Sequence, residues 1–274
     1  MKKFIVFLLL SSSLYSLAQD STSQRSSKSE RKEEKRKRMN AIVKQEEEGV
    51  LAYNKQSSFG LQLRTNGYGL FYELGRAKSP RSTNLYLIEI TEIKHPKEEK
   101  ETNTDGFFSN SFVYGKINNF YQVKLGFGKQ YIFGQKGNKN GIAVMGIYQG
   151  GLSLGLLRPY YLNVFDDQKE RDIKYDSPDS ALFLSGGSII GSSGFGKGWS
   201  ELKMKPGAFV KGSLRFDFGR FNEQVQAIEI GLSVDAYSQK IEIMAPRDGQ
   251  GFEAVKPKQF FFQGHIAFLF GRRK

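Results

Sequence analysis

The sequence contains no cysteine among its 274 residues and only two histidines. Without cysteine there is no disulfide framework, no thiolate metal site and no residue to carry a lipid anchor. Two histidines do not make a dense metal cluster, because the other ligands would have to be carboxylates brought together by the fold. The composition therefore predicts a protein that works without a metal or other cofactor.

Long apolar runs are also absent after the first twenty residues, where none approaches the roughly 18–20 positions of a spanning helix. Abundant instead are 23 Phe, 13 Tyr and 30 Gly. These residue types suit strands, tight bends and the aromatic girdles of membrane barrels. The chain is therefore predicted to be all-β, either in a membrane or as a soluble β-sandwich.

The first 19 residues have the pattern of a signal peptide. Lys2 and Lys3 precede the apolar run from Phe4 to Leu10, and Ser16-Leu17-Ala18 supplies a small-x-small cleavage site. Export predicts that neither nucleic acid nor nucleotide is a partner. The net charge of +13 favours attraction to anionic lipid head groups instead.

Residues 20–50 are predicted to form a charged helical arm in the periplasm, because Lys, Arg and Glu are dense there and pairs such as Glu34 and Arg38 meet on a helix surface. No apolar heptad supports a coiled coil. The basic run Lys35, Arg36, Lys37 and Arg38 suits lipid phosphates, cell wall or an acidic partner. The alternative is a helix that is simply solvated.

From Ser58 onward, apolar and polar residues alternate with the period of two that is typical of strands. Such alternation is clear on the segment 119–132, where Val123 and Leu125 share one face and Lys124 the other. The pattern predicts eight strands, at about 58–65, 67–76, 84–93, 119–132, 141–158, 205–218, 225–238 and 259–270.

The connections between these segments alternate in length. Those at 76–83, 133–140 and 219–224 are short, whereas those at 95–118, 159–204 and 239–258 are long. One exception is a tight turn predicted at Asn66-Gly67, an Asn-Gly step that favours a two-residue hairpin. A soluble sandwich has no reason to show this parity, so residues 51–274 are predicted to form an antiparallel outer-membrane β-barrel with both ends in the periplasm.

The chain end resembles the last strand of small outer-membrane barrel proteins of Gram-negative-type bacteria. Gln263, Gly264, Phe268 and Phe270 are similar to the polar, glycine and spaced-aromatic signal of that strand. Gly264 lies one place from where the pattern puts its glycine, and residues 271–274 follow the last aromatic. The resemblance implies the barrel architecture and assembly into an outer membrane, without indicating one family.

Two patterns of catalytic or nucleotide chemistry are incomplete. Gly191, Gly196 and Lys197 nearly satisfy the phosphate-binding loop, but Gly198 stands where a hydroxyl should bind magnesium. We therefore expect a flexible outer loop there. A surface deacylase using His95 or His265 with a serine and an acid is a further alternative that depends on geometry.

Charged side chains on one face of the strands are predicted to fill the barrel lumen, because barrels of about eight strands enclose only side chains. Since both signs occur, we expect mutual neutralisation. The predicted lumen residues are Arg64, Glu73, Lys124, Lys211, Arg215, Asp217, Glu229, Asp235 and His265.

A plugged barrel predicts a non-enzymatic structural or accessory subunit of an envelope complex, with outer-membrane lipid and other envelope proteins as partners. The alternatives are a narrow channel or small-ligand transporter and a lipid-modifying enzyme.

Overall fold

The computed structural model describes residues 30–37, 39–40, 53–102, 110–138, 140–176, 178–245 and 255–274. The predicted signal peptide, Arg38 and most of the predicted arm lie outside these residues. Within the arm, residues 30–37, 39 and 40 are helical, and their side chains are exposed. In the described part of the chain, no helix has the length and apolar character needed to cross a membrane.

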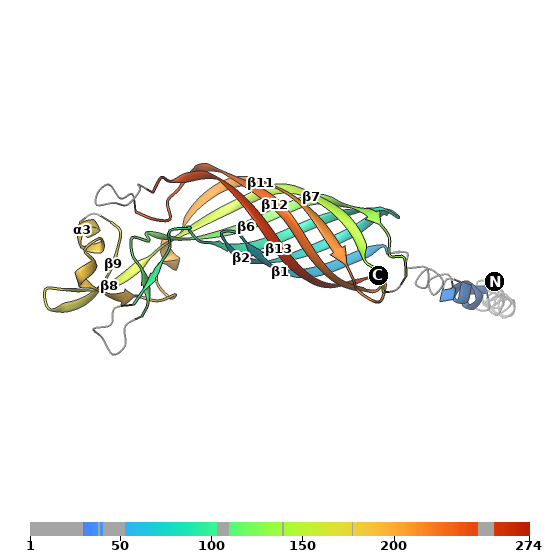
Figure 1. The fold of residues 1–274 in the computed structure, drawn as a ribbon, viewed down its shortest axis with the longest axis horizontal. Helices are drawn as coiled ribbons and strands as arrows, with labels where there is room; N and C mark the ends of the chain where they lie inside the picture. Colours follow the sequence, from blue (N-terminus) through green and yellow to red (C-terminus); the bar gives the residue numbers. More distant parts are fainter. Residues whose placement is uncertain are drawn as a thin grey trace, which may run out of the picture.

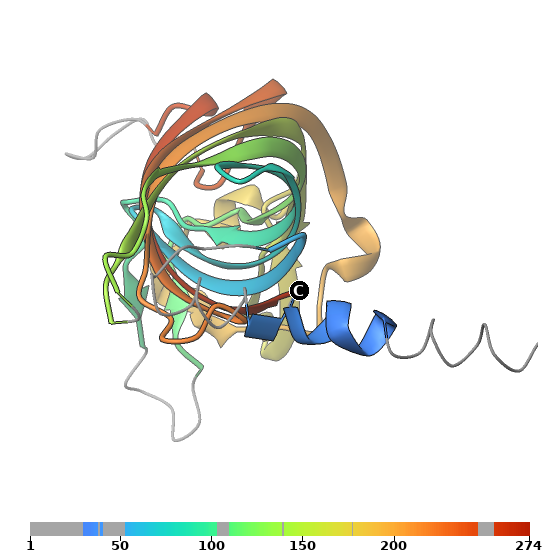
Figure 2. The ribbon, with the colours of Figure 1, turned by 90° about the vertical axis from the view of Figure 1, so that its right-hand side faces the viewer.

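Eight antiparallel strands close into a barrel in the ring order β1-β13-β12-β11-β7-β6-β3-β2 (Figures 1 and 2). Every strand predicted from the alternation is confirmed, and the soluble-sandwich alternative is wrong. Both terminal strands are longer than predicted, since β1 begins at residue 55 and β13 continues to residue 273. The strands are β1 (Lys55–Arg64), β2 (Gly67–Ser79), β3 (Ser82–Ile93), β6 (Asn118–Gly134), β7 (Ala143–Pro159), β11 (Lys203–Asp217), β12 (Gln224–Ile241) and β13 (Lys258–Arg273).

Connection length separates the two ends of the barrel. The turns after β2, β6 and β11 lie at one end, called here the short-turn end, where β1 begins and β13 finishes (Figure 1). The connections after β3, β7 and β12 lie at the opposite, long-loop end. The alternation of short and long connections in the sequence thus corresponds to the two ends of the folded barrel.

The first hairpin differs by one residue from the prediction. Arg64 pairs with Gly67, so the two-residue turn is Thr65-Asn66 and Gly67 is the first residue of β2. A Cβ atom on Gly67 would lie 1.9 Å from the carbonyl oxygen of Glu92. The glycine is therefore required by the close approach of β3 rather than by the turn.

Glycines inside the barrel make room for aromatic rings. A Cβ atom on Gly60 would lie 2.2 Å from a ring carbon of Phe71, and one on Gly126 would lie 2.7 Å from Phe209. Both rings are buried. The narrow lumen thus holds large side chains beside small ones on the same or a nearby part of the wall.

The connection at 159–204, predicted to be long, contains folded elements. It contains a three-stranded sheet of β8 (Tyr161–Asp166), β9 (Lys169–Lys174) and β10 (Ile189–Ser192), the helix α3 (Ser180–Phe183), and two short turns of 3₁₀ helix, η1 (Gly186–Ser188) and η2 (Trp199–Glu201). The pair β4 (Lys100–Glu101) and β5 (Phe112–Val113) comes from the connection after β3.

These segments fold because they bury enough apolar surface to order the chain. Their shared core consists of Phe112, Ile117, Leu162, Val164, Ile173, Phe183, Ile189 and Ala245. We call residues 110–117 and 160–193 with this core the cap. It projects from the long-loop end, away from both barrel termini (Figure 1).

Candidate functional site

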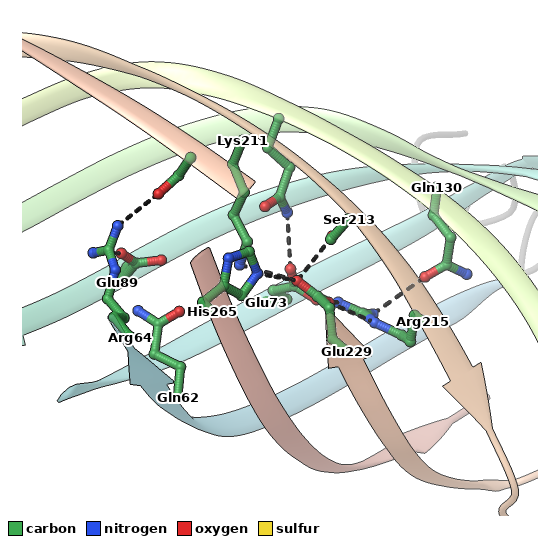
Figure 3. Close-up of polar contacts among 12 residues, drawn as sticks. Gln62, Arg64, Glu73, Glu89, Gln130, Lys211, Ser213, Arg215, Glu229 and His265 are labelled. Atoms are coloured by element: carbon green, nitrogen blue, oxygen red, sulfur yellow. Dashed lines mark hydrogen bonds and ion pairs between the residues drawn. The ribbon is translucent and has the colours of Figure 1, made fainter. Parts of the chain in front are cut away.

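All nine predicted lumen residues point into the barrel and are buried. Figure 3 shows how several of them converge from different strands. Together with further charged partners they form three groups of ion pairs. The grouping is set by ring order and strand register, which bring together residues that are distant in the sequence.

Arg215 is the centre of the first group. Its Nη2 donates to Oε2 of Glu73 at 2.5 Å and to Oε2 of Glu229 at 2.6 Å. The other oxygen of Glu229 lies 3.0 Å from Nζ of Lys211 and 3.3 Å from Nε2 of His265. Two carboxylates and their cationic partners therefore neutralise one another at full burial (Figure 3).

A second group lies nearer the long-loop end. Nζ of Lys124 is 2.6 Å from Asp235, and Nη1 of Arg64 is 3.1 Å from Glu89. Lys124 also approaches Glu89 at 3.4 Å, so the four residues form one network. Glu89 was missed from the sequence, although it alternates with the outward Ile88 and Ile90 and so carried the signal.

The third group closes the short-turn end. Asp217 pairs with Lys136 at 3.3 Å and also with Arg273, whose guanidinium lies 5.0 Å from the ring of Tyr53. Glu229 pairs with Lys211 and Arg215, and Asp235 pairs with Lys124. Asp217 pairs instead with Lys136 and Arg273. Lys136 and Arg273 were missed because both lie outside the predicted strand segments.

Aromatic rings pack against cations of the first two charged groups. Nζ of Lys211 lies 4.8 Å from the ring centroid of Phe71, and Nζ of Lys124 lies 5.0 Å from that of Phe209. Both rings are buried, so these cation–π contacts place apolar surface beside the ammonium groups inside the lumen.

An apolar cluster seals the lumen at the long-loop end. Phe120 packs against Tyr237 and Phe261 with ring centroids 5.5 and 5.6 Å apart. Ile93 and Leu157 complete the inward-facing part of this cluster, and loop residues such as Met244 pack on it. Nε2 of Gln122 donates to the Tyr237 hydroxyl at 2.6 Å, which joins this seal to the charged groups beneath.

The histidines do not form a hydrolytic triad. Ser213 donates to Oε1 of Glu229 at 2.9 Å, the same oxygen that faces His265. A triad needs the serine to bond to the histidine, with the acid behind it. His95 instead accepts from the backbone N–H of Lys97 at its Nδ1.

The glycine-rich segment is not a phosphate-binding loop either. Gly191 belongs to β10 rather than to a strand-to-helix turn, and Lys197 pairs with Asp172. Within the described ranges, no three His, Asp or Glu side chains are grouped in a way that could hold a metal ion.

The outer wall of the barrel is apolar. Its alternate side chains point away from the lumen, and some are more than two-thirds exposed, among them Leu152 at 71%, Leu232 at 72% and Phe262 at 76%. Soluble proteins rarely expose continuous apolar surfaces of this extent, whereas a membrane barrel presents such a band to lipid. The polar interior and apolar exterior of the barrel are those of a protein that spans a bilayer.

The chain folds as a closed eight-stranded β-barrel with the apolar outer wall that is typical of membrane barrels.

No protein-family model and no curated protein matches the sequence. Three solved structures are similar in architecture. The N-terminal barrel domain of Pseudomonas aeruginosa OprF matches with 8% identity over 80% of this chain and 99% of that chain, at a TM-score of 0.35. Neisserial surface protein A matches with 6% identity over 80% and 96%, at 0.36. Ail, the attachment invasion locus protein of Yersinia pestis, matches with 7% identity over 81% and 99%, at 0.34. The assignment rests on the closed ring and apolar wall described above, not on these loose likenesses.

Proposed function

We propose that this protein is a non-conducting outer-membrane scaffold, a structural or accessory subunit that presents its cap to other envelope components. The observation that carries the proposal is the filled lumen. Ion pairs cross it, aromatic rings pack against two of the cations, and the cluster of Phe120, Tyr237 and Phe261 closes its long-loop end. A barrel of this kind leaves its loops as the working surface.

The proposed orientation places the cap outside the cell. Outer-membrane barrels have short periplasmic turns and longer extracellular loops. The short-turn end receives the chain from residues 20–50, so the charged arm would then lie in the periplasm. Lys35, Arg36 and Lys37 are exposed there and suit an anionic envelope partner.

The cap supports a docking role because it is ordered. Its sheet has its own apolar core, and Arg171 joins Asp166 to Asp179 through hydrogen bonds of 2.9 Å to each. A preformed surface loses less conformational entropy on binding than a flexible loop does. Phe165, at 54% exposure, is an apolar side chain available to a partner on this surface.

Planar-bilayer recording tests the proposal directly. Purified wild-type protein should give no current steps above background under conditions in which a general diffusion porin conducts. Arg215→Ala should stay closed as well, since the apolar cluster is untouched. Reproducible wild-type steps whose ion preference changes in Arg215→Ala would support the channel alternative instead.

The partner is tested by site-specific photocrosslinking in the native membrane. A crosslinker at Phe165 should give a discrete protein adduct, whereas the matched position Leu152 on the barrel wall should contact lipid alone. Equal adducts at both positions would contradict a docking role for the cap.

A further inference from the structure

One segment of the chain lies against the outside of the barrel instead of above it. We call residues 194–202 the strap; it connects β10 to β11 and includes η2. Viewed along the barrel, η2 stands outside the ring of strands (Figure 2). The strap therefore occupies the side of the wall that faces the surroundings of the barrel.

Arg158 shows how closely the strap packs. Leu157 points into the lumen cluster, so its neighbour Arg158 points outward, yet only 5% of Arg158 is exposed. Three rings cover its guanidinium, with centroids 4.6 Å away for Phe195, 4.9 Å for Trp199 and 5.8 Å for Tyr121. An outward arginine is thus shielded by aromatic side chains.

Hydrogen bonds and one glycine fix this arrangement. The carbonyl of Phe195 accepts from Nη1 of Arg158 at 2.5 Å and from the indole N–H of Trp199 at 2.8 Å. Gly198 has a φ of +85°, and a Cβ atom there would lie 2.7 Å from the carbonyl oxygen of Pro159. Only glycine allows the strap to lie this close to the wall.

The strap extends the lipid-facing surface. Trp199 stacks on Tyr121, with centroids 5.7 Å apart and planes at 18°. Tyr121 shares the outer face of β6 with Leu125 and Phe127, which are 57% and 49% exposed. The rings of the strap are therefore continuous with the apolar wall.

The charges of the strap are already paired with the cap. Lys197 pairs with Asp172, and Glu201 lies 2.5 Å from Lys174. The apolar side chains that the strap exposes are aromatic, since Phe195 is 67% and Trp199 40% exposed. They lie beside the partly exposed, paired side chains of Lys197 and Glu201. Because the indole N–H of Trp199 is satisfied within the strap, its exposed ring edge is apolar.

We propose that the strap is an interfacial anchor that binds the lipid surface of the outer leaflet. Phe195 and Trp199 sit at the boundary between head groups and acyl chains, the level at which aromatic side chains concentrate in membrane proteins. By joining this boundary to the cap through the pairs Asp172–Lys197 and Lys174–Glu201, the strap fixes the height of the cap above the membrane.

Trp199 is the only tryptophan in the chain, so its fluorescence reports this site alone. The full protein is reconstituted in phosphatidylcholine vesicles carrying bromine either near the head-group end of the acyl chains or near their middle. Shallow bromine should quench Trp199 severalfold more than deep bromine, and aqueous iodide should quench it weakly.

Two variants calibrate the depth, both carrying Trp199→Phe. Adding Leu152→Trp places the reporter on the wall, where deep bromine should quench most. Adding Phe165→Trp places it on the cap, where iodide should quench most. Heat-modifiable gel mobility confirms that each barrel is folded. If Trp199 responds to iodide as Phe165→Trp does, and to neither brominated lipid, the strap does not bind the lipid surface.

Discussion

Arg215 and Glu73 form an ion pair across the full width of the barrel, with Nη2 and Oε2 2.5 Å apart. Their strands, β11 and β2, stand four places apart in the ring of eight, which is the opposite side. Both side chains are fully buried. The wall is therefore braced by its own interior, and we expect the charges that fill the lumen to contribute to stability.

Removing Arg215 should destabilise the barrel. Arg215→Ala leaves Glu73 and Glu229 with one fewer cation in a sealed interior, and losing one partner of a buried pair commonly costs about 3–5 kcal/mol. Urea unfolding in phospholipid vesicles measures the effect. Arg272→Ala, at an exposed position of the same barrel, should change stability by less than about 0.5 kcal/mol. Equal unfolding midpoints for the two variants would show that the pair is not a brace.

The free-energy cost of a charge on the outer wall should depend on its depth in the bilayer. Leu232→Arg places a cation on the outward face of β12 and should cost about 2–4 kcal/mol if the site lies near the bilayer midplane. Gln226→Arg is the matched control, because it lies on the same face of the same strand but closer to the short-turn end. Vesicle unfolding gives both values, and the same cost at both positions would contradict the placement of the band.

The strands could be predicted because a barrel wall separates two solvents. Lipid outside and a polar lumen inside impose strict alternation, so Lys124 between Val123 and Leu125 already indicated its face. Strand length and loop parity followed from the same constraint. The turn at Thr65-Asn66 was displaced by one residue because the glycine signal came from packing against Glu92.

The pairing inside the lumen could not be predicted to the same extent. Which carboxylate meets which cation depends on ring order and register, and these bring Asp217 beside Arg273, beyond the predicted end of β13. The cap was missed because its core draws single residues such as Leu162 and Phe112 from separate connections. The strap was missed because Gly196 and Lys197 resembled part of a phosphate-binding loop.

His95 should titrate below the ordinary histidine range. Burial lowers its pKa from 6.5, Lys258 and Lys97 act in the same direction, and Glu98 opposes them. Since the folded pKa lies below the unfolded one, the stability that neutral His95 contributes is present above about pH 6.5 and is lost as pH falls through the folded pKa. NMR titration of the imidazole protons, assigned with His95→Gln, measures it. A midpoint at or above 6.5 would contradict the burial of the ring.

Epitope insertion tests the orientation of the barrel. The β8–β9 turn at Asp167 and Gln168 suits an insertion, because both residues have positive φ in a tight turn at the tip of the cap and pack on no core. An epitope placed there should bind antibody on intact cells.

The matched insertion after Gly137, in the turn between β6 and β7, should bind only after the outer membrane is permeabilised. Gly137 suits this control because a Cβ atom there would meet nothing within 4 Å. Heat-modifiable mobility shows that both variants fold, which leaves accessibility as the one difference between them. Binding at Gly137 on intact cells, with the Asp167 site protected, would place the cap in the periplasm and the charged arm outside, and would overturn the proposal that the cap is the outward docking surface.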